Sequence, residues 1–185
     1  MKSRPNSQPG NVVRIVGGQF RSRLLRFPDL PGLRPTPDRV RETLFNWLGQ
    51  RLHGWSCLDA FAGSGALGFE AASRGAGRVL MLEREAAAEA ALRRHAAELP
   101  APMVEVRRQD ALSYLSGPGE CFDLILLDPP FSGDLLEPAL RSAATRLNPG
   151  GKIYAESPQP LAPEGYAVLR SGRAGLSHFC LLETV

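Results

Sequence analysis

Residues 57–70 read Cys-Leu-Asp-Ala-Phe-Ala-Gly-Ser-Gly-Ala-Leu-Gly-Phe-Glu, and this stretch decides the fold of the chain. An apolar strand leads into a turn in which Gly63, Gly65 and Gly68 have the spacing G-x-G-x-x-G. Glycine lets the backbone turn tightly and lets a ligand approach it closely. The helix that follows directs unpaired backbone N–H groups at the space above the turn. A strand-to-helix turn without any ligand is the alternative interpretation of this motif alone.

Strand and helix patterns alternate through the rest of the chain. Strands are expected at 56–60, 78–83, 103–107, 122–127 and 151–156, and helices at 66–74, 85–99, 110–115 and 135–147. Repeated strand–helix units predict a parallel sheet with right-handed crossovers. Two final strand-like runs at 166–170 and 177–183 have no helix between them, so they predict an antiparallel hairpin. The predicted fold is therefore α/β and Rossmann-like, with a mostly parallel seven-stranded sheet that ends in this hairpin.

A small extension is predicted in front of the sheet. Strand-like runs at 12–16 and 20–27 flank Gly17-Gly18 and predict a hairpin that turns at the two glycines. Thr36 is expected to cap the helix that follows. We therefore divide the chain into a disordered start at 1–11, a basic hairpin and helix at 12–54, and a main domain at 55–185.

The net charge of +3 is unevenly distributed along the chain. Through His53 there are ten Lys and Arg against three Asp and Glu, a balance of +7, and the remainder has a balance of −4. This asymmetry indicates an anionic polymer as partner, with a solvated basic face as the alternative. The arginines predicted to contact nucleic-acid phosphates are Arg14, Arg21, Arg23, Arg34, Arg39 and Arg41.

Composition is typical of a soluble protein of a reducing compartment. Hydrophobic residues make up 43% and charged residues 22%, and no apolar run is long enough to span a membrane. Cys57, Cys121 and Cys180 are an odd number without a close pair, so we expect buried free thiols and a cytoplasmic location. The histidines do not cluster with cysteines or acids at ligand spacing, so no metal site is predicted, and His95 is expected to be solvated.

Asp59 indicates the chemistry of the ligand. It lies four residues before Gly63, near the end of the first strand of the main domain. A carboxylate there would repel the pyrophosphate of a dinucleotide, but it suits a cationic ligand that carries an amine. The pattern Asp-x-x-x-Gly-x-Gly resembles the first motif of class I methyltransferases, whose cofactor S-adenosylmethionine carries a sulfonium and an ammonium group.

Two further carboxylates follow strands and fit a ligand that contains adenosine. Glu83 ends the strand at 78–83, where a carboxylate can accept hydrogen bonds from both ribose hydroxyls, as it does in NAD sites. Asp110 follows the third strand and, in a methyltransferase, would accept from the adenine amine. Helix capping is the alternative role for both acids. The predicted cofactor site consists of Asp59, Phe61, Gly63, Ser64, Gly65, Glu83, Asp110 and Ala111.

The tetrapeptide Asp128-Pro129-Pro130-Phe131 follows the apolar run 122–127. Consecutive prolines fix the backbone and leave their carbonyls free as acceptors. The Asp128 carboxylate and the Pro129 carbonyl can hold the two hydrogens of an exocyclic base amine, and Phe131 can stack on a flipped base. These four residues are the predicted catalytic residues. The alternative is a plain strand-exit turn with Phe131 in the core.

This tetrapeptide resembles the catalytic motif of methyltransferases that act on exocyclic amines of adenine or guanine. Three longer segments resemble the bacterial RsmD family: RIVGGQFR at 14–21, LRPTPDRVRETLFNWL at 33–48 and LDAFAGSGALG at 58–68. The resemblance covers nearly the whole chain after residue 11. That family methylates guanine N2 in 16S ribosomal RNA, so the resemblance implies S-adenosylmethionine as cofactor and a small-subunit assembly intermediate as partner.

We therefore expect a monomeric cytoplasmic methyltransferase, with residues 55–185 as the catalytic domain and residues 12–54 as an RNA-binding extension. Three alternatives stay open from the residues alone. One is an adenine-N6 methyltransferase that acts on DNA or RNA. The others are a non-catalytic RNA-binding assembly factor and an NAD-dependent oxidoreductase.

Overall fold

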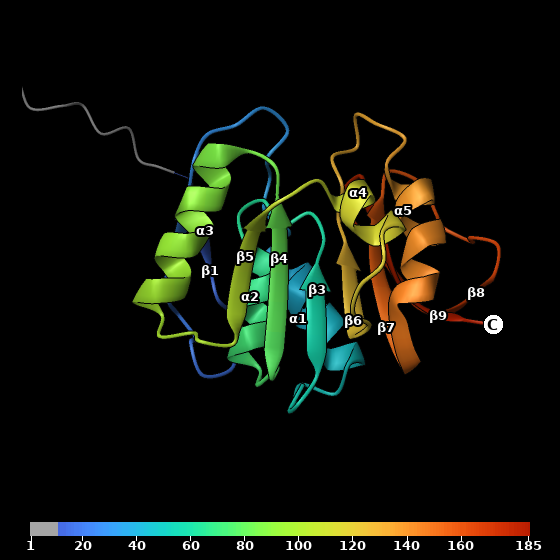
Figure 1. Cartoon of the computed structure of the whole chain (residues 1–185), viewed down its shortest axis with the longest axis horizontal. Coiled ribbons are helices and arrows are strands. Elements are labelled where there is room, and N and C mark those ends of the chain that lie inside the picture. The colour runs from blue at the N-terminus through green and yellow to red at the C-terminus, as the bar shows by residue number, and fades with distance from the viewer. Residues whose placement is uncertain (1–10) are drawn as a thin grey trace, which may run out of the picture.

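The computed structural model describes residues 11–185, which form a seven-stranded sheet, a two-stranded hairpin and five α-helices (Figure 1). The strands of the large sheet are β3 (Ser56–Asp59), β4 (Arg78–Glu83), β5 (Val104–Arg108), β6 (Phe122–Leu127), β7 (Leu147–Ser157), β8 (Tyr166–Ala174) and β9 (Ser177–Thr184). The helices are α1 (Asp38–Trp47), α2 (Ala66–Ser73), α3 (Ala86–Glu98), α4 (Ala111–Ser116) and α5 (Leu136–Ala143), with a 3-10 turn η1 (Ala144–Arg146). Every helix within residues 11–185 is too short or too polar to span a bilayer. The start predicted for residues 1–11 lies outside the described residues except for Asn11, which begins β1 (Asn11–Arg14).

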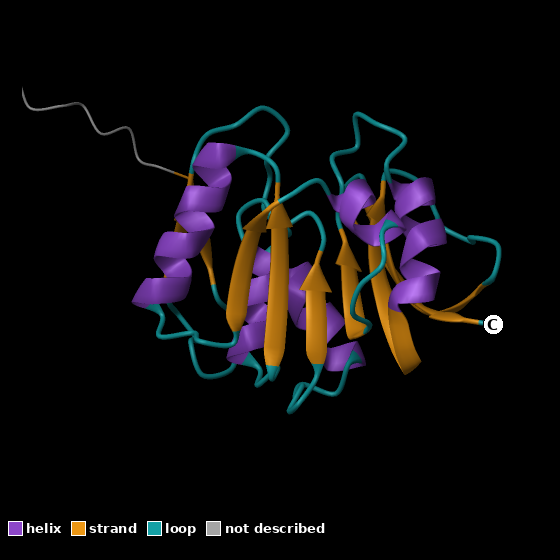
Figure 2. Cartoon of the chain, in the orientation of Figure 1, coloured by secondary structure: helices purple, strands orange, loops and turns teal. Residues whose placement is uncertain are grey.

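The large sheet has the strand order β5-β4-β3-β6-β7-β9-β8. The pairs β7–β9 and β9–β8 are antiparallel, and the other four pairs are parallel. This order confirms the predicted fold. Helices α1, α2 and α3 contribute to the core on one face, and α4 and α5 to the core on the other (Figures 1 and 2). Because helices cover both faces, β6 is buried along nearly its whole length, as its apolar sequence requires.

The strand order reverses between β3 and β6, which pair although they are distant in the sequence. Ligands of such sheets bind outside the carboxyl ends of the strands at this switch point. In Figure 1 the parallel strands point upward, so these ends form the upper edge of the sheet. The loop at 28–37 also lies at the upper edge, whereas the loop at 15–23 lies at the lower edge.

The N-terminal hairpin differs from the predicted one. Its strands are only β1 and β2 (Leu24–Phe27), and the segment 15–23 joins them in place of a turn at Gly17-Gly18. Gly18 packs against the end of α2, where a Cβ on it would lie 2.0 Å from the carbonyl oxygen of Ser73. Close packing against a helix therefore requires this glycine, and a tight hairpin turn does not.

This loop also changes the predicted arrangement of the basic residues. A strand at 20–27 would place Arg21 and Arg23 on one face. Both arginines instead lie in the loop 15–23 and are exposed. This loop lies at the opposite edge of the sheet from the switch point (Figure 1).

Two smaller predictions about buried side chains are wrong. Cys57 and Cys180 are buried as expected. Cys121 is exposed, because it lies in the loop before β6 and not in the buried strand itself. His95 was expected to be solvated, yet its ring is buried and its Nε2 lies 2.7 Å from the carbonyl oxygen of Arg26. His95 therefore links α3 to the edge of the hairpin.

A buried ion pair attaches the extension to the main domain. The side chains of Arg41 on α1 and Glu70 on α2 are both fully buried, with Nη1 and Oε2 at 3.0 Å. Arg41 also donates from Nε to the carbonyl oxygen of Thr36 at 3.1 Å and from Nη1 to that of Arg14 at 2.7 Å. Glu70 also accepts from Val16 N, Gly17 N and Arg74. The guanidinium of Arg41 is thus unavailable to an RNA phosphate, so the predicted RNA contact of Arg41 is wrong.

Removing one partner of this ion pair should destabilise the protein strongly. We expect Arg41→Ala to lower the free energy of unfolding by about 3–5 kcal/mol, because Glu70 would keep a buried charge without its partner. Urea unfolding of the purified protein measures this change. Arg39→Ala, an exposed arginine on the same helix, is the matched control and should stay within about 0.5 kcal/mol. Equal effects of the two substitutions would contradict the role of the ion pair.

Candidate cofactor and catalytic site

Four neighbouring strands bring acidic side chains together at the upper edge of the sheet. Asp59 ends β3 and Glu83 ends β4. Asp128 directly follows β6, and Glu156 lies on β7 one residue beyond the last β6–β7 pair. Because these strands are parallel neighbours, the sheet collects the four carboxylates around the switch point.

The glycine loop between β3 and α2 has the geometry that its sequence predicts. Gly63 (φ +53°) and Gly65 (φ +82°) have left-handed backbone conformations, which glycine adopts without a steric penalty. The Gly63 N–H donates to Oε2 of Glu83 at 2.9 Å, so the acid at the end of β4 holds the loop. Gly68 serves packing, because a Cβ there would lie 2.4 Å from Cε of Met81.

Asp59 lies beneath this loop and is almost completely buried, with 1% of its surface exposed. Its Oδ2 accepts from the Gly68 N–H at 2.9 Å, while Oδ1 has no hydrogen-bond partner within residues 11–185. Burial raises the pKa of Asp59 to about 7, although the Gly68 N–H opposes this shift. A buried carboxylate oxygen that lacks a partner fits a ligand with a cationic amine.

The other predicted cofactor residues lie around the loop in different environments. Glu83 is partly exposed, and both of its oxygens accept backbone N–H groups, from Gly63 and Glu85. Asp110 accepts from the Ser113 N–H at 2.9 Å and so caps α4, which was the alternative role considered for it. Its contact with the adenine amine stays a prediction. Phe61 is partly exposed, and Ser64 and Ala111 are buried.

The tetrapeptide after β6 forms a corner at the upper edge. Asp128 is partly exposed, Pro129 is buried and Pro130 is exposed. Phe131 is 48% exposed, so the alternative that places it in the core is wrong. Although the residue as a whole is partly exposed, burial of its carboxyl group and the charge of Glu156 raise the pKa of Asp128 well above its usual range.

Thr36 reaches this corner from the N-terminal extension. Its Oγ1 lies 3.2 Å from Oδ2 of Asp128 and 3.1 Å from Oε1 of Glu156. The prediction that Thr36 caps a helix is therefore wrong: α1 begins at Asp38, the cap position is Pro37, and no side chain caps the helix. The hydroxyl that a cap would use instead contacts two carboxylates.

Sequence reasoning misses both neighbours of Asp128. Glu156 ends the strand predicted at 151–156, so the strand-end rule that singles out Asp59 and Glu83 also applies to it. Thr36 has no comparable signal, because its contact with Asp128 spans 92 residues of sequence.

Comparison with known proteins identifies the family. The model of a family described as "Conserved hypothetical protein 95" matches residues 13–183. The chain is 41% identical to "Ribosomal RNA small subunit methyltransferase D" of Escherichia coli K12 over 178 residues, which cover 93% of this chain and 90% of that protein. The chain belongs to the RsmD family. The predicted resemblance is thereby confirmed.

Two further comparisons agree with this assignment. The protein of the same name from Haemophilus influenzae is 39% identical over 188 residues, with 97% of this chain and 96% of that protein covered. The solved structure of "Putative methyltransferase yhhF" from Escherichia coli has a TM-score of 0.83 at 40% identity and covers 94% of this chain and 98% of its own. The sheet and its C-terminal hairpin are therefore those of a class I methyltransferase.

The predicted RNA-binding arginines are spread over both ends of α1. Arg34 and Arg39 are exposed and flank Thr36 at the upper edge. Arg14 is also exposed, and its Nη2 lies 3.1 Å from Oδ2 of Asp38. Arg21 lies in the loop 15–23. Arg34 and Arg39 are the arginines that lie within three residues of Thr36, which contacts Asp128.

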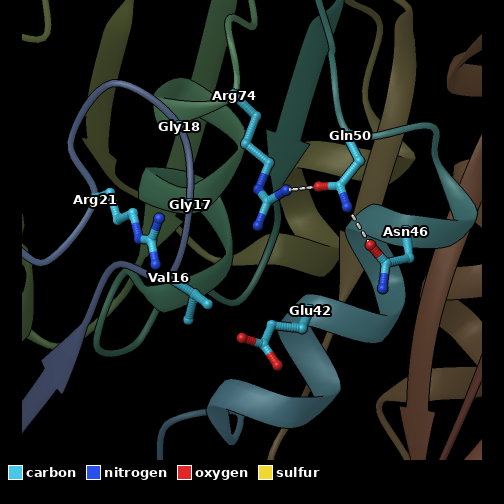
Figure 3. Close-up of a pocket in the computed structure, with 8 residues that line it drawn as sticks. All are labelled: Val16, Gly17, Gly18, Arg21, Glu42, Asn46, Gln50 and Arg74. Atoms are coloured by element: carbon cyan, nitrogen blue, oxygen red, sulfur yellow. Dashed lines mark hydrogen bonds between the residues drawn. The ribbon is translucent and has the colours of Figure 1, made fainter.

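Arg21 lines a pocket of about 510 Å³ at the far end of α1 (Figure 3). The pocket is lined by Val16, Gly17, Gly18, Arg21, Glu42, Asn46, Gln50 and Arg74. In Figure 3 the guanidinium of Arg74 is hydrogen-bonded to the side chain of Gln50, and Glu42 points into the opening from α1. None of these lining residues belongs to the predicted cofactor site, so the pocket is separate from it.

The pKa of Asp59 predicts how cofactor affinity depends on pH. Affinity for S-adenosylmethionine should fall as the pH drops through about 7, because protonation neutralises the carboxylate that attracts the ammonium. The ionised, binding form exists above that pKa and is lost below it. In Asp59→Asn this dependence should vanish, and affinity above pH 8 should be about tenfold lower because a charged hydrogen bond is removed.

Calorimetric titration of the cofactor from about pH 5.5 to 8.5 tests this prediction across the raised pKa. Asp128→Asn is the matched control, since it removes the other carboxylate with a raised pKa and should keep the pH dependence. If the dependence instead disappears in Asp128→Asn and persists in Asp59→Asn, the titrating group is Asp128.

Proposed function

We propose that this protein transfers a methyl group from S-adenosylmethionine to the exocyclic N2 amine of a guanine in 16S ribosomal RNA. The observation that carries the proposal is the corner at Asp128, where Asp128 and the exposed Phe131 follow β6, the strand paired with the one that leads into the glycine loop of a methyltransferase fold. The relatives named ribosomal RNA small subunit methyltransferase D support ribosomal RNA as the substrate. The motifs shared with the RsmD family support guanine N2 as the acceptor.

The residues around the glycine loop fit this cofactor. S-adenosylmethionine supplies an electrophilic methyl group on a sulfonium, which is a good leaving group. The free oxygen of Asp59 would accept a hydrogen bond from the ammonium. Glu83 would accept from the ribose hydroxyls and Asp110 from the adenine amine, through oxygen lone pairs that their backbone contacts leave free.

The catalytic corner would orient the acceptor nitrogen. An exocyclic amine is a weak nucleophile because its lone pair is delocalised into the ring. The carboxylate of Asp128 and the carbonyl of Pro129 would each accept one amine hydrogen, which directs the lone pair at the methyl group. Phe131 would stack on the flipped guanine, since it is exposed and follows Asp128 by three residues.

Asp128 would also accept the proton that leaves the methylated amine. A nitrogen that has gained a methyl group becomes acidic, and a base with a raised pKa holds its proton more readily than an ordinary aspartate does. Asp128 therefore has both the position and the basicity for this step.

The RNA would be held along the exposed side of the extension. Arg34 and Arg39 are exposed and lie within three residues of Thr36, which contacts Asp128, so they would hold phosphates next to the flipped base. Arg14, Arg21 and Arg23 would contact phosphates farther along the RNA. We propose a monomer that acts on a small-subunit assembly intermediate, because the described residues supply the acceptors, the stacking ring and the basic side chains of one complete site.

Replacing Asp128 should abolish methyl transfer without abolishing cofactor binding. We expect Asp128→Ala to lower kcat by at least about 100-fold, because both the amine acceptor and the proton acceptor are removed. Transfer of labelled methyl groups to small-subunit RNA measures kcat, and calorimetry measures cofactor affinity. Asp134→Ala is the matched control, since Asp134 is an exposed acid in the same loop. Near-normal turnover in Asp128→Ala would support the alternative that the tetrapeptide is only a turn at the end of a strand.

Replacing Arg34 and Arg39 should weaken RNA binding and its dependence on salt. We expect the slope of log affinity against log salt to flatten by about 0.7 for each RNA phosphate that the protein no longer neutralises. Cofactor affinity should not change. Arg141→Ala is the matched control, because Arg141 is 73% exposed on α5, on the opposite face of the sheet. An unchanged slope in Arg34→Ala/Arg39→Ala would mean that these side chains form a solvated basic face.

One experiment identifies the base that is modified. Ribosomal RNA from a strain that lacks this gene is digested to nucleosides and analysed by mass spectrometry. The proposal predicts the loss of one N2-methylguanosine from 16S RNA, restored by the purified protein and S-adenosylmethionine. Loss of N6-methyladenosine would instead support the adenine alternative. No loss, with RNA binding retained, would support the non-catalytic assembly factor.

A further inference from the structure

Glu156 is a buried carboxylate beside the catalytic corner. It is 4% exposed, and hydroxyl groups hold it among the described residues. Oε1 accepts from the hydroxyl of Tyr154 at 2.6 Å, and Oε2 accepts from that of Ser177 at 3.0 Å. The third hydroxyl is that of Thr36, which lies 3.1 Å from Oε1. No Lys or Arg within residues 11–185 forms an ion pair with this carboxylate.

Such an environment is costly for a group that only supports the fold. A buried carboxylate without a cationic partner loses hydration that hydroxyl donors replace only in part. A glutamine at this place could accept from Tyr154 through its oxygen and donate to Ser177 through its amide nitrogen, without the charge. The negative charge therefore requires a reason outside packing, and the nearest functional group is Asp128, which shares Thr36 with it.

We propose that Thr36 and Glu156 are positioning residues for Asp128, so that the N-terminal extension completes the catalytic corner. Thr36 fixes the orientation of the Asp128 carboxylate through its hydroxyl. Glu156 holds Thr36 in place and makes Asp128 more basic through its negative charge. This inference deepens the function proposed above and rests on it.

The backbone geometry supports this role for Thr36. Its carbonyl oxygen accepts from Nε of the buried Arg41, which itself pairs with Glu70. The main chain of Thr36 is thus fixed by α1, and its side chain is directed at the carboxylates of Asp128 and Glu156 at the ends of β6 and β7. Thr36 is itself 4% exposed, so its hydroxyl serves the two carboxylates and not solvent.

The hydroxyl of Thr36 carries one hydrogen and faces two carboxylates, so it donates to one of them at a time. When it donates to Asp128 it favours the ionised form, whereas the charges of Glu156 on β7 and Asp59 on β3 favour the protonated form. The other titratable groups of this cluster are Tyr154, which faces Glu156, and Cys180 on β9, which adjoins Tyr154. The two positioning residues therefore shift the pKa of Asp128 in opposite directions: Thr36 lowers it and Glu156 raises it.

These opposite shifts can be tested through the pH dependence of kcat/KM. The assay uses the purified full-length protein, S-adenosylmethionine and small-subunit RNA from the deletion strain. In Thr36→Val the ionised Asp128 loses a donor, so the acidic limb of kcat/KM should move up by about one pH unit. In Glu156→Gln a like charge is removed, so the limb should move down by about one pH unit. Thr36→Val should also lower kcat by about tenfold, and Thr36→Ser, which restores the hydroxyl, should recover most of it.

Thr43→Val is the matched control, because Thr43 lies on α1 and donates to the carbonyl of Arg39, away from the carboxylates. It should leave the pH profile unchanged. Cofactor affinity of all variants should stay within about twofold of wild type. Limb shifts in the same direction for Thr36→Val and Glu156→Gln, or no shifts at all, would overturn the proposal.

A second measurement separates this proposal from the proposed function. Carbon-13 NMR titration of the Asp128 carboxyl, assigned with Asp128→Asn, reports its pKa without any methyl transfer. Opposite shifts by NMR in a protein that methylates no RNA would sustain the positioning role and refute the proposed function. Active protein in which neither variant moves the Asp128 resonance would sustain the function and refute the positioning role.

Discussion

The buried ion pair between Arg41 and Glu70 is the interaction on which the arrangement of this molecule depends. Its two side chains come from α1 and α2, and neither is exposed. Around it gather the backbone of β1, the start of the loop at 15–23 and the carbonyl of Thr36. A charge pair without water is stable only when every polar atom finds a partner, so the pair forces these segments into one arrangement.

Thr36 links this ion pair to Asp128. The same residue is held by Arg41 at its carbonyl and contacts Asp128 with its hydroxyl. The extension is therefore more than a basic appendage on a methyltransferase domain, because its Thr36 contacts Asp128, the proposed catalytic residue. A boundary at residue 54 separates two segments of sequence, but these segments share one site.

The protein has a cluster of acidic side chains at the strand ends and exposed arginines on the extension. Asp128 lies close enough to Glu156 and Asp59 for their charges to raise its pKa, and burial raises the pKa of both Asp59 and Asp128. A cofactor with a sulfonium and an ammonium suits this acidic cluster, whereas RNA phosphates would be repelled by it. Arg34 and Arg39 are exposed on the extension. In the proposed function, the two segments would therefore bind ligands of opposite charge.

The sequence by itself determined the sheet, the glycine loop and most strand-end acids. These features follow from local rules: alternation of strands and helices, the conformational freedom of Gly63 and Gly65, and the tendency of parallel strands to present their last residues at one edge. The turn predicted at Gly17-Gly18, the cap predicted at Thr36 and the RNA contact predicted for Arg41 were wrong for a common physical reason. Each residue has an ordinary local role that a distant partner overrides: the end of α2 for Gly18, Asp128 and Glu156 for Thr36, and Glu70 for Arg41. Only the tertiary structure decides such pairings, because hydrogen bonds and ion pairs between segments far apart in the chain leave no periodic signal in the sequence.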